Sequence, residues 1–190
     1  RILQLESPGG EPFEEETTAN AEAFIRAPRD KPFFLSIGHG LAHHSRWDYS
    51  FCESYDRFGP LDWRYVRPLP HLPDTPATRW EAAMQYRASE YLDVHIGRIL
   101  DVVDEAGLAD DTLMLFTTDH GPGLPGVKVN LNDRGTGVAL IARGPGGFSG
   151  GKVVDGIVHH VDLYPTLCEL LELDPPAWLE GKSLMPMVRD

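Results

Sequence analysis

Long apolar runs, clustered basic residues and paired cysteines are all scarce in this 190-residue chain. No apolar run approaches the roughly 20 residues that a transmembrane helix requires, so we expect no membrane span. The formal net charge of −12 disfavours nucleic acid as a partner, because binding phosphates requires clustered Lys and Arg. The two cysteines, Cys52 and Cys168, lie far apart without CxxC spacing and indicate no compartment. This composition favours a small substrate.

The composition is that of a globular protein, with 42% hydrophobic and 24% charged residues. A chain of this length can bury one substantial core. It begins with Arg1 rather than Met, and the opening stretch to Thr18 is polar and acidic with no capped element of its own. We therefore expect a piece of a longer protein.

The apolar pattern alternates between helical and extended segments. It predicts a surface helix over 15–29, a long amphipathic helix that begins after the N-cap Thr75 and stops at Gly107, and a helix over 161–173. Buried strands are expected over 32–38 and 112–118, with a third strand over 137–143 and a candidate fourth over 153–158. The aperiodic stretch 39–73 is expected to wall a pocket. This order predicts one α/β layer structure with its ligand chemistry at the strand ends.

Asp119 and His120 form the sharpest local feature, because a carboxylate and an imidazole stand side by side where a hydrophobic strand ends. Both side chains can ligate a divalent cation, and Gly121 lets the backbone turn closely around an ion. The alternative is an Asx-type turn that closes the strand and leaves His120 merely exposed.

Lys128 and a group of three histidines could act on an anionic substrate. Lys128 lies in a Gly- and Pro-rich loop, where it is either a point charge for a sulfate or phosphate oxygen or a solvated surface residue. His39, His43 and His44 leave a predicted strand and are either proton donors or a structural hydrogen-bond set. His159 and His160 stand directly before the predicted helix over 161–173, and the start of that helix is the simpler explanation for two polar residues at this place.

With these features in order, the chain resembles the sulfatase family of the alkaline-phosphatase superfamily, from about Asn20 to the end. The order and spacing of the matching segments carry the resemblance more than any one of them. They are residues 30–35 (DKPFFL), 72–76 (LPDTP), 92–100 (LDVHIGRIL), 107–112 (GLADDT), 116–121 (FTTDHG), 161–166 (VDLYPT) and 179–184 (LEGKSL).

The resemblance implies an alkaline-phosphatase-like sandwich, in which helices flank a central and mostly parallel sheet. It places Asp119 and His120 on two metal-ligand positions, with calcium as the usual ion. Lys128 falls on the lysine that contacts the sulfate group. His43 falls on the histidine that hydrogen-bonds the sulfate or assists the leaving group, with His44 as the fallback. Ala42 stands where the family usually has proline.

Two expected parts of such a site are absent from the sequence. Neither Cys52 nor Cys168 lies in the Cys-x-Pro-x-Arg motif whose cysteine becomes the formylglycine nucleophile, and the early Asp-Asp metal-ligand pair is missing as well. We therefore expect residues 1–190 to be a single partial catalytic domain, without the nucleophile-bearing part or the C-terminal subdomain and inactive alone. The family is commonly exported, to the periplasm, the lysosome or the cell exterior.

The intact protein is thus expected to be a metal-dependent hydrolase of sulfuric esters or sulfamates, acting on a small-molecule or saccharide substrate. One alternative is a phosphatase, phosphodiesterase or phosphonate hydrolase of the same superfamily, since Asp-His-Gly at a strand end also serves two-zinc sites. The other is a non-catalytic relative that kept the fold. The sequence does not determine the oligomeric state.

Overall fold

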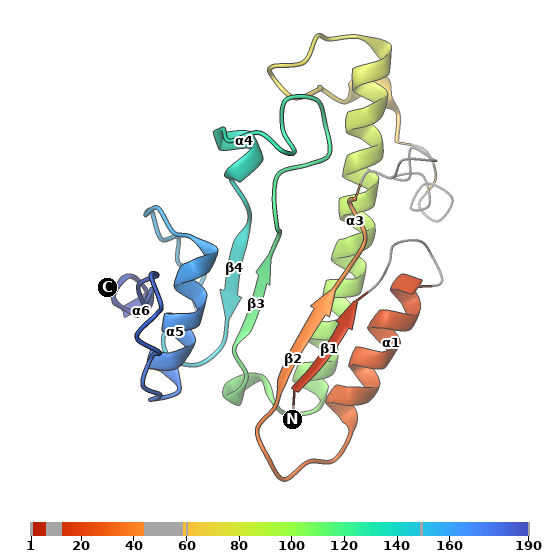
Figure 1. Ribbon diagram of the computed structural model, residues 1–190. Coiled ribbons are helices and arrows are strands. Elements are labelled where there is room, and N and C mark those ends of the chain that lie inside the picture. The colour runs from red at the N-terminus through yellow and green to blue at the C-terminus, as the bar shows by residue number, and fades with distance from the viewer. Residues whose placement is uncertain (1, 7–12, 44–58, 60, 149, 190) are drawn as a thin grey trace. The chain divides into compact units, whose positions relative to one another are not determined.

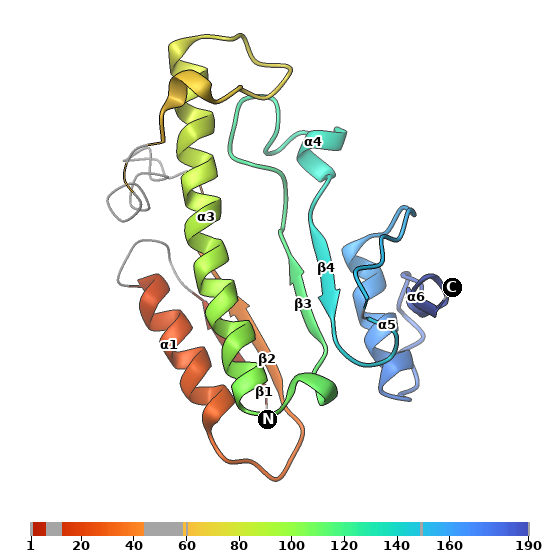
Figure 2. The same cartoon turned by 180° about the vertical axis from the view of Figure 1, so that it is seen from behind.

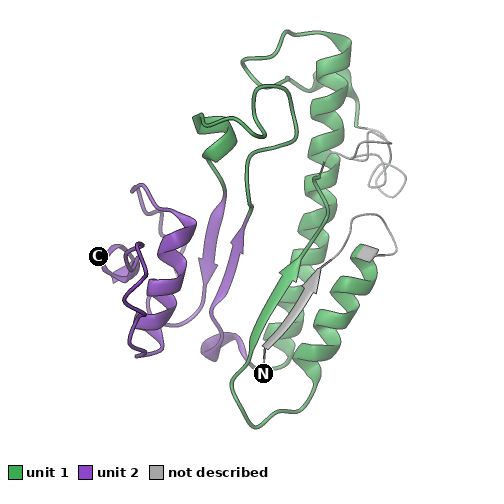
Figure 3. Cartoon of the chain, viewed as in Figure 1, with its two compact units in different colours: residues 1–107, 118–138 green, residues 108–117, 139–190 purple. Residues whose placement is uncertain are grey.

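A computed structural model describes residues 2–6, 13–43, 59, 61–148 and 150–189 (Figure 1). His44 and Cys52 lie outside these residues. The chain divides into two compact units, which are described separately (Figure 3). Unit 1 comprises Arg1–Gly107 with Thr118–Val138, and unit 2 comprises Leu108–Thr117 with Ala139–Asp190.

Unit 1 begins with a strand, a helix and a second strand parallel to the first. Strand β1 (Ile2–Glu6) pairs with β2 (Phe34–Gly38), and helix α1 (Phe13–Arg26) connects them and contacts both (Figure 1). Such a crossover is the usual way to join parallel neighbours. The expectation that the opening stretch has no element of its own was therefore wrong, whereas the predicted helix over 15–29 and strand over 32–38 are confirmed with shifted ends.

The long helix predicted after Thr75 is α3 (Pro76–Glu105). The Thr75 hydroxyl accepts from the Thr78 backbone N–H, and the Thr78 hydroxyl accepts from the Thr75 N–H, which completes a capping box. Gly107 follows the helix with a φ of +68°, a conformation that glycine adopts without strain. The predicted start and stop of this helix are therefore both confirmed.

Helices α1 and α3 lie side by side in unit 1 (Figures 1 and 2). The Arg98 guanidinium of α3 bonds the Glu15 and Glu22 carboxylates of α1, and these partners raise the pKa of Arg98. Arg26 at the end of α1 donates to Glu105 at 3.0 Å. Polar contacts thus fix the register of two helices whose buried faces pack together.

One apolar core cluster of unit 1 gathers along the first half of α3. Its buried members are Val66, Ala82, Ala83, Met84 and Ala88, with Ala42, Leu61, Trp63 and Trp80 packed against them. The segment before α3, including the short 3₁₀ helix η2 (Trp63–Tyr65), therefore folds back onto the helix. Part of the stretch expected to wall a pocket belongs to the core instead.

Unit 2 contains an antiparallel pair, β3 (Met114–Thr117) and β4 (Leu140–Arg143), after the 3₁₀ turn η3 (Ala109–Asp111). Both strands were predicted, but the expectation that 32–38 and 112–118 form buried strands was wrong. Leu115 in β3 is 37% exposed, and Phe34 in β2 of unit 1 is 53% exposed. The reason is that, among the described residues, each of these strands pairs with a single neighbour in a two-stranded sheet.

The fourth strand predicted over 153–158 does not form. Val153 and Ile157 are 88% and 89% exposed, and the segment has no strand partner among the described residues. β-branched residues favour strands only where a neighbour supplies hydrogen bonds and a packing surface. The prediction failed because the sequence pattern carries no information about that neighbour.

Unit 2 ends in two short helices, α5 (Leu163–Leu170) and α6 (Met185–Arg189), with the 3₁₀ turn η4 (His160–Asp162) before α5. The Asp162 carboxylate accepts from the backbone N–H groups of His159 and Lys182, each at 2.8 Å. These bonds lower the pKa of Asp162. The predicted helix over 161–173 is confirmed but shorter, because Glu172 adopts a φ of +55°.

Among the helices of the described ranges, none has both the length and the apolar character needed to cross a bilayer.

Candidate functional site

Asp119 and His120 lie in unit 1, two and three residues after the end of β3. The Asp119 side chain is 85% exposed and the His120 side chain 32%, with Asp119 Oδ2 3.2 Å from His120 Nε2. His120 Nδ1 lies 2.6 Å from the carbonyl oxygen of Gly121. A carbonyl can only accept, so Nδ1 donates to Gly121, and Nε2 is the ring nitrogen that faces the Asp119 carboxylate.

This geometry fits a shared cation. Two acceptors about 3 Å apart have the spacing of neighbouring ligands around an ion whose bonds are about 2.3 Å long. Among the described residues no group of three or more His, Cys, Asp and Glu side chains could hold a metal ion. Asp119 and His120 are thus two neighbouring polar side chains, and their role as metal ligands stays a prediction.

The loop after His120 is closed by tight backbone contacts. Gly121 is buried, and its N–H donates to the carbonyl of Gly135 at 3.0 Å. A Cβ on Gly121 would lie 1.8 Å from the Arg134 carbonyl oxygen, so no other residue fits there without moving the loop. Asn132 caps the short helix α4 (Asp133–Thr136) by accepting from the Arg134 and Gly135 N–H groups. The residues around Asp119 and His120 are thus held by their own backbone.

Lys128 and His43 meet within unit 1, although 85 residues separate them in the sequence. Lys128 Nζ lies 3.0 Å from His43 Nε2, and since an ammonium group can only donate, His43 accepts through Nε2. The Lys128 N–H also donates to the Pro122 carbonyl at 3.3 Å, which ties it to the loop that follows His120. The structure therefore brings these two predicted site residues together.

His43 closes a β-turn in which its N–H donates to the Gly40 carbonyl at 3.2 Å. Ala42 in this turn has a φ of +69°, and its side chain packs against the core along α3. A proline ring holds φ near −65°, so this backbone excludes proline at position 42, where the family resemblance led us to expect one. Ala42 is therefore a departure from the family pattern that the turn itself explains.

Several polar residues near the site gave no signal in the sequence. His71 Nε2 lies 2.8 Å from the Pro125 carbonyl and supports the loop that carries Lys128. His95 is fully buried, with Nδ1 2.8 Å from the Thr18 hydroxyl. The Glu14 carboxylate, also fully buried, bonds His39. Neither His71 nor His95 has a polar neighbour in sequence that would predict these contacts, which depend on tertiary packing.

The histidines before α5 take structural positions. The His159 N–H donates to the Asp162 carboxylate at the helix entry, as the simpler interpretation held. His160 Nε2 lies 2.8 Å from the Thr117 hydroxyl, which donates to the Ala139 carbonyl. His160 therefore braces the end of the β3–β4 pair within unit 2.

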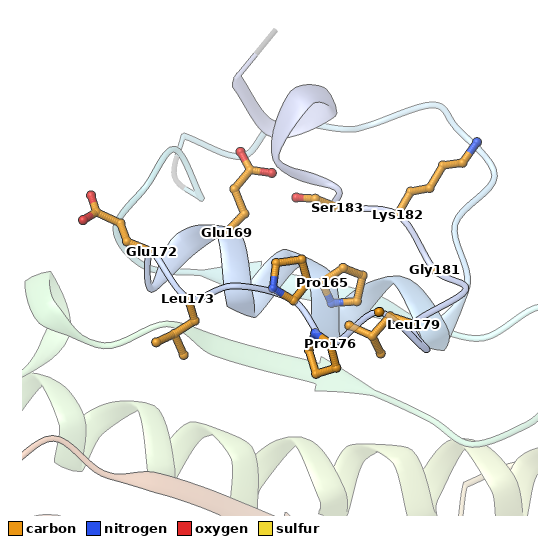
Figure 4. Close-up of a pocket in the computed structure, with 11 residues that line it drawn as sticks. Pro165, Glu169, Glu172, Leu173, Pro176, Leu179, Gly181, Lys182 and Ser183 are labelled. Carbon is orange, nitrogen blue, oxygen red and sulfur yellow. The ribbon is translucent and has the colours of Figure 1, made fainter.

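Unit 2 also contains an open cleft of about 730 Å³ beside α5 (Figure 4). Its lining is mostly proline, leucine and backbone, with Glu169, Glu172 and Lys182 as the charged members. Asp119, His120, Lys128 and His43 all belong to unit 1, and none of them lines this cleft. The cleft therefore contains none of the predicted site residues.

Similar solved structures define the fold class of this chain. Ps i-CgsB, solved with k-i-k-neocarrahexaose, superimposes with a TM-score of 0.67 at 21% identity, covering 92% of this chain and 38% of that one. The yidJ protein of Bacteroides fragilis gives a TM-score of 0.76 at 20% identity, covering 92% of this chain and 40% of that one. The expected α/β fold of the alkaline-phosphatase type is thereby confirmed.

The family follows from the sequence comparison. The family model described as Sulfatase matches residues 3–173, and the chain belongs to the sulfatase family. Human N-sulphoglucosamine sulphohydrolase is 31% identical over 189 residues, covering 86% of this chain and 38% of that protein. Mouse steryl-sulfatase is 34% identical over 119 residues, covering 53% of this chain and 19% of that protein. The chain thus spans well under half the length of these relatives.

Proposed function

We propose that the protein containing this chain is a metal-dependent hydrolase of sulfuric esters or sulfamates, with Asp119, His120, Lys128 and His43 in its active site. The observation that carries the proposal is the meeting of Lys128 Nζ and His43 Nε2 at 3.0 Å in a chain of the sulfatase family. A cation and an imidazole at this spacing can both bond one tetrahedral anion.

Asp119 and His120 would hold part of the cation shell, most simply of Ca²⁺, which prefers oxygen ligands such as the exposed Asp119 carboxylate. When bound, the ion would supply positive charge that neutralises the sulfate oxygens. The formylglycine nucleophile expected of the family would come from outside residues 1–190. The chain's own residues would bind and orient the sulfate group.

Lys128 and His43 would have different roles in the reaction, Lys128 as a fixed positive charge and His43 as a proton donor. A sulfate oxygen that takes over the hydrogen bond from Lys128 Nζ releases His43 Nε2 from its present partner. His43 can then take up a proton from solvent water on Nε2 and donate that proton to the bridging oxygen or nitrogen as its bond to sulfur breaks. Lys128, which keeps its charge, stabilises the developing negative charge on sulfur-bound oxygen.

The test is a calcium titration of aryl sulfate hydrolysis by the intact protein, comparing wild type with Asp119→Ala. We expect activity that rises with calcium in wild type and is lost, or needs far more calcium, in the variant. The exposed carboxylate of Asp110, replaced in Asp110→Ala, serves as the matched control. Undiminished turnover in Asp119→Ala at the same calcium concentration would rule out its role as a ligand.

A second candidate is phosphate or phosphonate ester hydrolysis. It is favoured by 31% identity over 104 residues to a multifunctional alkaline phosphatase superfamily protein, PehA, of Trinickia caryophylli, covering 52% of this chain and 20% of that protein. Parallel assays with aryl sulfate, aryl phosphate and phosphodiester substrates would separate the two. A non-catalytic relative would turn over none of them, and a calcium titration would then show little or no binding.

A further inference from the structure

The turn that presents His43 is anchored on a carboxylate far from it in the sequence. Glu14, near the start of α1, is fully buried. One of its oxygens, Oε1, accepts from the Gly40 N–H at 2.8 Å, and the other, Oε2, lies 2.7 Å from His39 Nδ1. Glu14 thus bonds two successive residues directly after β2.

Each of these bonds restrains the chain immediately before His43. Because a carboxylate accepts only, His39 donates through Nδ1, which fixes both its tautomer and its ring plane. Gly40, whose N–H is bonded to Glu14, supplies the carbonyl that accepts from His43 at 3.2 Å. A continuous path of hydrogen bonds therefore runs from Glu14 through Gly40 and His43 to Lys128.

This anchor is itself packed between two helices. The His39 ring lies 5.6 Å from the ring of His95 in α3, and His95 in turn bonds Thr18 in α1. The His39 side chain is only 11% exposed, so it points into the unit while His43 is exposed. The turn is thus held on its inner side through His39 and Glu14.

The turn also needs such an anchor. Ala42 has a φ of +69°, a conformation that residues with a Cβ adopt at a cost. Neighbouring contacts must supply the energy that keeps it there. The two bonds to Glu14 on one side of Ala42 and the Lys128–His43 bond on the other meet that requirement.

We infer that Glu14 is a positioning residue of the anion site, holding through His39 and Gly40 the turn that presents His43 to Lys128. The inference rests on the proposed function for its catalytic consequence, whereas its structural content concerns Glu14 and the turn alone. Glu14 itself touches no substrate atom and acts only through the turn.

The experiment compares Glu14→Gln and Glu14→Ala with wild type in the intact protein. Glu16→Ala is the matched control, since Glu16 is an exposed glutamate on the same helix. Amide hydrogen exchange is measured for residues 39–43 and for α3, and kcat and KM are measured with an aryl sulfate. Glu14→Gln keeps the size of the side chain and one acceptor for the Gly40 N–H, while it faces His39 with an amide.

We expect exchange at Gly40 and His43 to rise at least tenfold in Glu14→Ala and by less in Glu14→Gln, with α3 protection unchanged in Glu14→Gln. The variants should lose about 10- to 100-fold in kcat with a smaller change in KM, because a displaced acid costs rate more than binding. Should Glu14→Ala fail to fold, Glu14→Gln decides alone.

Wild-type exchange at residues 39–43 in the folded Glu14 variants, or the same change in Glu16→Ala, would overturn the inference. Absence of aryl sulfate turnover in wild type would instead count against the proposed function. The exchange result would still stand, because it is independent of catalysis.

Discussion

Val129, next to Lys128, combines two features that rarely occur together. It is 95% exposed, and its φ is +61°, a strained conformation for a β-branched residue. Val129→Asn should therefore raise the free energy of unfolding by about 1 kcal/mol, since asparagine tolerates this conformation and no buried contact is lost. Urea unfolding of the protein would measure the change.

Leu131 provides the control for that substitution. It is 98% exposed and is not among the residues with positive φ, so Leu131→Asn should leave stability nearly unchanged. Equal effects of the two substitutions would show that replacing an exposed apolar side chain, not relief of backbone strain, is responsible.

For single residues, the sequence indicated which side chains are candidates for the site, but it did not predict the tertiary contacts that fix their positions. The Asp119-His120 pair and Lys128 stood out by residue type and order, and His43 by its place after a strand. Glu14 and His95 did not, because their significance lies in burial and in partners 26 and 77 residues away. Contacts between residues so far apart in the sequence cannot be predicted from the residues that surround each partner.

The packing of α1 against α3 makes stability depend on pH through His95. Burial lowers the pKa of His95 below its usual 6.5, and nearby His39 and Arg98 act in the same direction, while Glu15 and Glu14 oppose it. The unfolded chain then binds a proton more readily than the folded chain. The free energy of unfolding should therefore fall as the pH drops below about 6.5, and level off below the pKa of the folded state.

His95→Gln removes this titration while keeping a polar group near Thr18. Urea unfolding at pH 7.5, 6.5 and 5.5 should show a smaller loss of stability in the variant than in wild type. Identical slopes in the two proteins would contradict the assignment of this pH dependence to His95.

Asp162 holds the segment before α6 against the start of α5. Asp162→Ala removes the acceptor for the His159 and Lys182 N–H groups, so it should lower stability by about 1–2 kcal/mol, because each hydrogen bond contributes roughly 0.5–1.5 kcal/mol. The exposed Asp174 gives a control in Asp174→Ala, with little expected change. A thermal melt in which both variants match wild type would disprove the structural role of Asp162.

Helices and strands were predicted best where the residues that start and stop the element lie within its own sequence. Helix α3 has its cap, its proline and its terminal glycine within its own sequence, and both ends were predicted. Strand β1 was missed because five residues in a polar context give too short a pattern, and 153–158 was wrongly assigned because a strand depends on a partner. Burial of β2 and β3 was overestimated for the same reason.

For the whole molecule, the resemblance read from ordered motifs proved more informative than any single motif. The chain belongs to the sulfatase family, yet it spans 38% of the length of human N-sulphoglucosamine sulphohydrolase. Unit 1 of the chain brings Asp119 next to His120 and Lys128 next to His43. The activity that we propose for these four residues is that of the intact protein.

The most direct test of the proposed active site is kcat/KM of the intact protein for an aryl sulfate in calcium, measured for wild type, Lys128→Ala and Lys31→Ala. We predict turnover by wild type, a loss of about 10²- to 10³-fold in Lys128→Ala, and no loss in Lys31→Ala, whose lysine is exposed. Full activity in Lys128→Ala, or turnover of the matching phosphate ester alone, would contradict the proposal.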